Sequence, residues 1–275
     1  HEKEPAFFDK DVNFDENNRV LGSKWRSYLE QFRNSDDDVD HADFLYLGDA
    51  TPCMVFPNVA ERIKNNCSGE SKIIICLRDP VKRAYSHFWH GYRLGLEDNC
   101  VESALIDEAA ESVKDTGLFP KYYLLNGRYW LHIDRFVKEF GIENVLLLKF
   151  ERLIENSNLE LGRVWDFLGL DQKEVENRKD NSAMLPRFPF LQRFLSSQGY
   201  LKSILKMLLP SQLRARLVVN VSKANMKVAQ YNAIDSELKN KLGGYFYDDN
   251  IILREKYNFD ISGWTAKDGE TFNDC

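Results

Sequence analysis

The sequence predicts an α/β fold in which helices cover a central parallel sheet and a helical part follows toward the C-terminus. Two short apolar runs, residues 72–77 and 145–149, carry this prediction, because strands in the middle of a parallel sheet are buried on both faces. Each run is followed by a segment with helical periodicity, the order that strand–helix–strand units require. At 275 residues the chain can form one α/β domain or two smaller ones.

Composition narrows the class of protein further. Hydrophobic residues make up 43% of the chain and charged residues 29%, which is typical of a globular protein. No apolar run approaches the roughly eighteen residues that a membrane helix needs. The net charge of −6 argues against a protein built to coat nucleic acid. The chain begins at His1 rather than at Met, so we expect it to be a fragment of a longer protein.

The cysteines and histidines form no metal-binding or disulfide pattern. Five cysteines occur without C-x-x-C or zinc-type spacing, so reduced thiols are expected. Cys76 lies in the first apolar run, where we expect a buried and unreactive side chain. His87 and His90 are one helical turn apart, but no carboxylate or third histidine nearby completes a ligand set. We therefore expect both histidines at the surface and no bound metal.

The end of the first apolar run has the pattern of a strand that turns directly into a helix. Asp79 suits the N-cap position, Pro80 suits the first helical position, and Gly95 marks the expected end. The start of a helix attracts anions, because its unpaired N–H groups and its dipole favour negative charge. Arg78 adds a planar fork of donors suited to phosphate, and Ser86 lies off the buried face two turns later. Taken alone, these residues also fit an Arg78–Asp79 salt bridge and a solvated Ser86.

Caps and periodicity predict the remaining elements. A strand is expected at 44–48, and Pro57 should begin a helix that leads to the 72–77 strand as a right-handed crossover. Further helices are expected at 119–140, 159–168 and 236–257.

A basic stretch precedes the last of these helices. Residues 181–234 contain no Asp or Glu but several Lys and Arg, and prolines divide the stretch into short leucine-rich helices. Three interpretations are open. The stretch can be a helical cap whose cations extend into water, the wall of a cleft that attracts an anionic cofactor and an anionic glycan, or a surface that lies on an anionic membrane.

The order Arg78-Asp79-Pro80 and then Ser86-His87-Phe88, all after an apolar strand, resembles a motif of sulfotransferases. These enzymes use 3′-phosphoadenosine-5′-phosphosulfate (PAPS), and the motif holds its 3′-phosphate. The resemblance implies that Arg78 and Ser86 contact that phosphate. It also implies a P-loop-type, three-layer α/β/α fold. Residues 1–275 would then be a single sulfotransferase domain with a basic helical cap at 181–230.

Two further segments extend the resemblance. Residues 3–9, K-E-P-A-F-F-D, resemble the K-E-P-H-F-F-D segment of carbohydrate sulfotransferases, among them the heparan sulfate enzymes. This implies that Glu4 is the general base for the acceptor; Ala6 replaces the family histidine. Without the other motifs, the segment is a charged terminal loop with Phe7 and Phe8 as core anchors. Lys227 lies where the heparan sulfate enzymes have a K-G-R loop on the nucleotide phosphates, so it is a candidate cofactor contact.

One family feature is missing from the printed sequence. Sulfotransferases carry an upstream strand and a K-x-G-T-T loop that cradles the 5′-phosphosulfate, and no such loop occurs in this sequence. We expect that the domain lacks its first strand and this loop because the sequence starts after them.

The function implied is transfer of a sulfuryl group from PAPS to a hydroxyl or amine, with a glycan as the expected acceptor and PAP as product. No metal and no nucleic acid polymer are expected, and membrane contact could come from 181–230 or from a missing anchor. A Golgi location would follow for a eukaryotic carbohydrate enzyme, and a cytoplasmic one otherwise. The alternatives are a non-catalytic nucleotide- or glycan-binding pseudoenzyme of the same fold and a P-loop kinase relative.

Overall fold

The computed structural model describes residues 6–32, 46–52, 54–67, 70–97, 100–109, 122–173, 175, 184–196, 211–228, 232–267 and 270–272. The chain divides into two compact units, each described here by itself. Unit 1 comprises His1–Cys76 and Tyr129–Lys173, and unit 2 comprises Leu77–Arg128 and Glu174–Cys275. The organisation of residues 1–275 as a single domain stays a prediction.

Unit 1 is a mixture of short helices and a small parallel sheet. The sheet pairs β1 with β2, and the last residue of β1, Leu77, opens unit 2. The elements in chain order are η1 (Asp11–Asn13), α1 (Lys24–Leu29), η2 (Glu30–Phe32), α2 (Val59–Asn66), β1 (Ile73–Leu77), α5 (Tyr129–Phe140), η5 (Ile142–Asn144), β2 (Val145–Lys149), α6 (Phe150–Glu155) and α7 (Ser157–Leu168).

The two predicted strands form, but β1 is not buried on both faces. Ile75 and Leu77 are buried, whereas Ile74 is 41% exposed. Cys76 is also exposed, so the prediction of a buried thiol was wrong. The reason is the pleat of the strand, which points successive side chains to opposite faces.

The thiol of Cys76 is nevertheless held in its protonated form. Restricted hydration of the sulfur, with the Glu151 and Glu160 carboxylates nearby, raises the pKa of Cys76 to about 11. Because the thiolate is the reactive form of cysteine, this side chain is a weak nucleophile at neutral pH.

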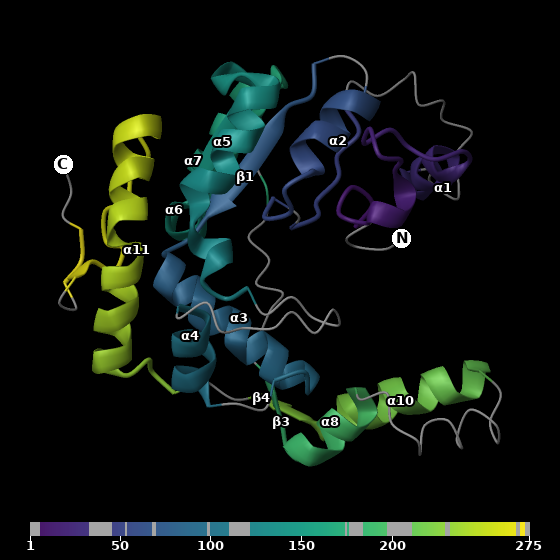
Figure 1. Ribbon diagram of the computed structural model, residues 1–275, viewed down its shortest axis with the longest axis vertical. Coiled ribbons are helices and arrows are strands. Elements are labelled where there is room, and N and C mark those ends of the chain that lie inside the picture. The colour runs from purple at the N-terminus through teal and green to yellow at the C-terminus, as the bar shows by residue number, and fades with distance from the viewer. Residues whose placement is uncertain are drawn as a thin grey trace. The chain divides into compact units, whose positions relative to one another are not determined.

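Unit 2 is mainly helical. Its elements are α3 (Pro80–Leu94), α4 (Val101–Ala109), η4 (Leu125–Gly127), β3 (Met184–Pro186), α8 (Pro189–Ser196), α10 (Ser211–Asn225), β4 (Met226–Val228) and α11 (Ser236–Tyr257). The core joins the buried face of α3 to α4 and α11, where Phe88, Leu105 and Phe246 are almost fully buried. Figure 1 shows α11 as a long helix toward the C-terminus. Strands β3 and β4 pair antiparallel, with Leu185 opposite Lys227.

Several predicted elements are confirmed at their ends. Helix α3 is capped by Asp79 and ends at Gly95, whose φ is 73°. Helix α7 ends before Gly169 in the same left-handed conformation. Strand β2 and helix α11 have the predicted bounds.

Two predictions are corrected. The expected helix at 119–140 is not continuous, because η4 and α5 are separated at Arg128, which has ψ 62°. Gly127, just before this break, lets the Phe246 ring pack closely: a Cβ at Gly127 would lie 2.8 Å from it. The expected strand at 44–48 is absent over residues 46–48, where Tyr46 and Leu47 are exposed. Residues 44 and 45 lie outside the described ranges.

Candidate functional site

The turn between β1 and α3 is built around a buried carboxylate. Asp79 is 0% exposed, and its Oδ1 accepts hydrogen bonds from the N–H groups of Val81 at 2.9 Å and Lys82 at 3.3 Å. Its Oδ2 accepts bonds from the N–H of Thr265 at 3.0 Å and from the Thr265 hydroxyl at 2.8 Å. A buried carboxylate needs such donors, because desolvation otherwise makes the charge very costly.

This capping changes how the turn can recognise an anion. The sequence predicts unpaired N–H groups at the start of α3, but those of Val81 and Lys82 are bound by the Asp79 side chain. The N–H of Arg83 donates to the Asp79 carbonyl at 2.9 Å. Pro80 has no N–H to offer. Recognition of an anion here therefore depends on side chains and on the helix dipole.

The two predicted phosphate contacts lie at this turn and on α3. Arg78 immediately precedes the cap, Ser86 lies two turns into the helix, and both are half-buried. Helical spacing places Lys82 one turn before Ser86 and His90 one turn after it on the same face. The ammonium group of Lys82 is 3.7 Å from Asp79 Oδ2, and its side chain is 50% exposed. The face that carries Ser86 thus has a positive charge near the turn.

Lys227 belongs to the same unit. It lies exposed on β4, opposite Leu185 of β3, and β3 packs against α3. The fold therefore places Arg78, Ser86 and Lys227 in unit 2. Their contacts with a nucleotide stay predictions.

A buried, hydrogen-bonded pair of polar residues lies beside α3 at His87. The Tyr123 hydroxyl donates to Glu97 Oε2 at 2.8 Å, and both residues are 1% exposed. The ring of His87 meets the Tyr123 ring edge-on at 4.9 Å. Burial, together with the charges of Arg83 and His90, lowers the pKa of His87 to about 3. His87 is thus half-buried rather than fully exposed, whereas His90 is exposed as predicted, and the His87 ring is neutral at physiological pH.

Glu4, the candidate base, lies outside the described residues. The segment that follows it in unit 1 is held through Thr51, whose hydroxyl accepts a hydrogen bond from the Ala6 N–H at 3.2 Å. The Thr51 hydroxyl donates to Asp49 Oδ1 at 2.6 Å, and the Tyr28 hydroxyl donates to Asp49 Oδ2 at 2.8 Å. Ala6 has φ 50°, a conformation that non-glycine residues adopt only where contacts enforce it.

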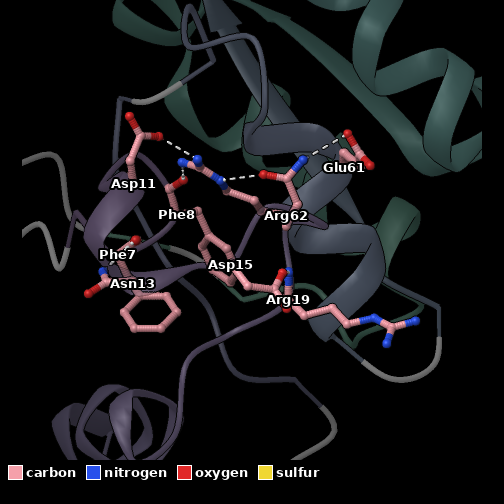
Figure 2. Close-up of polar contacts among 9 residues, drawn as sticks. Phe7, Phe8, Asp11, Asn13, Asp15, Arg19, Glu61 and Arg62 are labelled. Atoms are coloured by element: carbon pink, nitrogen blue, oxygen red, sulfur yellow. Dashed lines mark hydrogen bonds and ion pairs between the residues drawn. The ribbon is translucent and has the colours of Figure 1, made fainter.

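Arg62 fixes the next part of this segment (Figure 2). Its side chain is 5% exposed and donates to the Phe8 carbonyl at 2.9 Å, to Asn18 Oδ1 at 3.0 Å and to Asp11. Phe7 and Phe8 are buried, so the prediction that they anchor this segment to the core is confirmed.

Some contacts had no signal in the sequence. Thr265 reaches Asp79 across 186 residues of chain. Arg128 reaches Asp249 of α11 across 121 residues, with Nε 2.7 Å from Oδ2. This hydrogen bond raises the pKa of Arg128 above its usual value. Neither pair has a local spacing that could have revealed it.

Among the residues that the structure describes, no group of three or more His, Cys, Asp or Glu side chains is arranged to hold a metal ion. Within the same ranges, no helix combines the length and apolar character that crossing a membrane requires.

A small parallel sheet whose first strand leads into a capped helix, together with a long helix toward the C-terminus, defines a mixed α/β protein. Residues 58–245 match the sulfotransferase domain family. The chain belongs to this family.

The curated relatives carry the names of heparan sulfate enzymes. Human heparan sulfate glucosamine 3-O-sulfotransferase 3B1 is 33% identical over 103 residues, or 38% of this chain and 26% of that protein. The bifunctional heparan sulfate N-deacetylase/N-sulfotransferase 1 of Caenorhabditis briggsae is 22% identical over 261 residues, or 90% of this chain. The chain spans about a quarter of the length of these relatives, 26% in each case.

The fold also matches a solved structure. The crystal structure of a sulfotransferase from Alicyclobacillus acidocaldarius aligns with a TM-score of 0.60 at 20% identity, over 96% of this chain and 86% of that one. At this identity the match shows the fold alone: a mixed α/β structure with a small parallel sheet and a long C-terminal helix.

Proposed function

We propose that this protein transfers a sulfuryl group from PAPS to a hydroxyl or amine of a carbohydrate. The observation that carries the proposal is the turn after β1, where Arg78, the capped start of α3 and Ser86 occur within the region matched by the sulfotransferase family. The names of the relatives support a glycan acceptor. A three-layer α/β/α fold of P-loop type in a single domain belongs to the same proposal.

We assign binding of the nucleotide to residues of unit 2. The Arg78 guanidinium and the Ser86 hydroxyl would donate to the 3′-phosphate, and Lys227 would add charge near the phosphates. Bonds of this kind are strong, because a guanidinium and a phosphate both carry full charge and match in geometry. PAPS, when bound, supplies the activated sulfuryl group.

We assign activation of the acceptor to Glu4. Its carboxylate would take the proton from the acceptor oxygen or nitrogen as that atom forms a bond to sulfur. The bond between sulfur and the phosphate oxygen breaks at the same time, and PAP leaves with the electron pair. Thr51 and Arg62 hold the segment that follows Glu4 in the sequence. In this proposal Arg78 contributes to the affinity for the nucleotide, and Glu4 contributes to the rate of turnover.

Two variants test this division. We expect Arg78→Ala to weaken PAP binding about tenfold to a hundredfold, the value of one charge-assisted hydrogen bond. Glu4→Gln should lower kcat and leave PAP affinity unchanged, because the proton transfer occurs only in the transition state. Isothermal titration with PAP and assays with labelled PAPS and heparan-type glycans measure the two effects. Arg254→Ala, half-buried on α11, and Glu16→Gln, exposed in unit 1, are the matched controls.

The outcomes separate the alternatives. PAP binding without transfer to any glycan or other hydroxyl or amine acceptor would favour a non-catalytic nucleotide-binding module. Tighter binding of ATP than of PAP would contradict the sulfotransferase assignment, because ATP has no 3′-phosphate. A Glu4→Gln variant that loses affinity and turnover equally would contradict the assigned roles.

A further inference from the structure

The Asp79 carboxylate joins two segments that are far apart in the sequence. One oxygen caps α3, and the other accepts two hydrogen bonds from Thr265. Thr265 lies in the C-terminal segment, residues 259–267 and 270–272, which follows α11. Both residues are buried, Asp79 at 0% and Thr265 at 1% exposure. The turn that carries Arg78 is therefore fixed from one side by its own helix and from the other by the C-terminal segment.

The C-terminal segment is itself held by contacts that do not involve Asp79. The N–H of Phe272 donates to the Trp264 carbonyl at 3.0 Å, and the N–H of Gly263 donates to the Phe272 carbonyl at 2.8 Å. Trp264 is 0% exposed. The Ala266 carbonyl lies so close to Gly243 of α11 that a Cβ there would be 2.1 Å from its oxygen. Thr265 is thus presented to Asp79 by a preorganised segment.

We infer that Thr265 is a positioning residue for the phosphate contact of Arg78, so that the C-terminal segment completes the nucleotide site. The inference rests on the proposed function. Arg78 is joined to Asp79 by one peptide bond, and the orientation of the Asp79 side chain is set jointly by α3 and Thr265. A small rotation of this residue would move the Arg78 side chain relative to Ser86.

Loss of the Thr265 hydroxyl has a definite consequence at Asp79. The carboxylate, which is buried, loses one hydrogen-bond donor, and another donor or cation within reach then becomes favourable. Lys82 is the described cation placed to respond, with its ammonium group 3.7 Å from Asp79 Oδ2. Its movement toward Asp79 would withdraw positive charge from the face that carries Ser86. Both effects weaken recognition of a 3′-phosphate specifically.

The test compares PAP with adenosine 5′-monophosphate, which lacks the 3′-phosphate. Isothermal titration gives both affinities for the intact protein. We expect Thr265→Val to lower the ratio of PAP affinity to 5′-monophosphate affinity about fivefold, less than the loss of one complete charge-assisted bond. Thr265→Ser, which keeps the hydroxyl, should restore the ratio. Thr271→Val is the matched control, because Thr271 pairs with Thr265 in the same β-bridge and is exposed.

Each result bears on one hypothesis. An unchanged ratio in Thr265→Val, with a lowered ratio in Arg78→Ala, would overturn the role of Thr265 and leave the proposed function standing. Equal loss of affinity for both nucleotides would overturn it too, since that is the effect of a purely structural residue. If Arg78→Ala leaves the ratio of PAP affinity to 5′-monophosphate affinity unchanged, the assignment of Arg78 to the 3′-phosphate, and with it the proposed nucleotide site, is contradicted. If Thr265→Val does not fold, Thr265→Cys replaces it: the thiol is of similar size but is a weaker donor, so the same affinity ratio should fall.

Discussion

At the scale of single residues, Arg62 is the main support of the N-terminal part of unit 1. Its guanidinium binds the Phe8 carbonyl, Asn18 and Asp11, and lies 4.7 Å from the centre of the Phe14 ring. The three acceptors come from short segments: the loop at Phe8, the 3-10 helix η1, and the turn next to the bridge between Phe14 and Val20. One buried cation therefore joins these segments by hydrogen bonds that add to their own backbone bonds.

We expect Arg62→Met to lower the free energy of unfolding by about 2–4 kcal/mol, because the buried Phe8 carbonyl and the half-buried amide oxygen of Asn18 lose this donor. Urea denaturation measures the change. Arg19→Met removes an exposed arginine nearby and should shift the free energy by less than about 0.5 kcal/mol. Asp11→Ala should also cost little, because the Asp11 side chain is 87% exposed and water screens the pair. A large loss in Asp11→Ala would show that the ion pair, and not the buried acceptors, holds the segment.

At the scale of elements, the contact between α11 and the C-terminal segment depends on a glycine. Gly243 is buried in α11, and the Ala266 carbonyl approaches it more closely than any side chain would permit. The next residue, Gly244, has nothing within 4 Å of the position of its missing Cβ. Two adjacent glycines in one helix thus have different roles: the first allows close packing, and the second only lowers helix propensity.

The two glycines make a matched pair for mutation. Gly243→Ala should destabilise the protein by about 1–3 kcal/mol, because the methyl group forces the C-terminal segment away from α11. Gly244→Ala should be neutral or stabilise it by up to about 1 kcal/mol through the better helix propensity of alanine. Thermal or urea unfolding of both variants gives the comparison. Equal effects in the two variants would contradict the close packing at Gly243.

At the scale of the whole molecule, stability should depend on pH through His87. Its pKa is about 3 in the folded protein and 6.5 in a model peptide. Between these values the unfolded chain binds a proton that the folded protein does not, so the free energy of unfolding falls as the pH is lowered. This contribution is fully present above pH 6.5 and is lost progressively down to about pH 3.

Urea denaturation between neutral pH and about pH 5 measures this effect, which one proton limits to about 1.4 kcal/mol per pH unit. His87→Gln should have a flatter pH dependence than the wild type. His90→Gln, at an exposed position on the same helix, should keep the wild-type slope. If the two variants behave alike, His87 is not the group that titrates.

Local signals predicted the elements whose ends are set by their own residues. Asp79, Pro80 and Gly95 defined α3, because capping depends on positions a few residues apart. The β3–β4 pair escaped prediction, since each strand has only three residues and the two lie about forty residues apart. The exposure of Cys76 also escaped, because a run of apolar residues does not show which face of the strand stays uncovered. The break at Arg128, whose side chain binds Asp249 of α11, was not predicted either.

The sequence by itself determined the likeness to sulfotransferases and the residues proposed for the nucleotide, Arg78 and Ser86, because motif residues a few positions apart are read directly. Only the tertiary structure showed that the first amides of α3 are bound by Asp79 and that Thr265 shares this carboxylate. The physical reason is distance along the chain. A hydrogen bond across 186 residues forms only when packing brings its two ends together, and no local pattern records it.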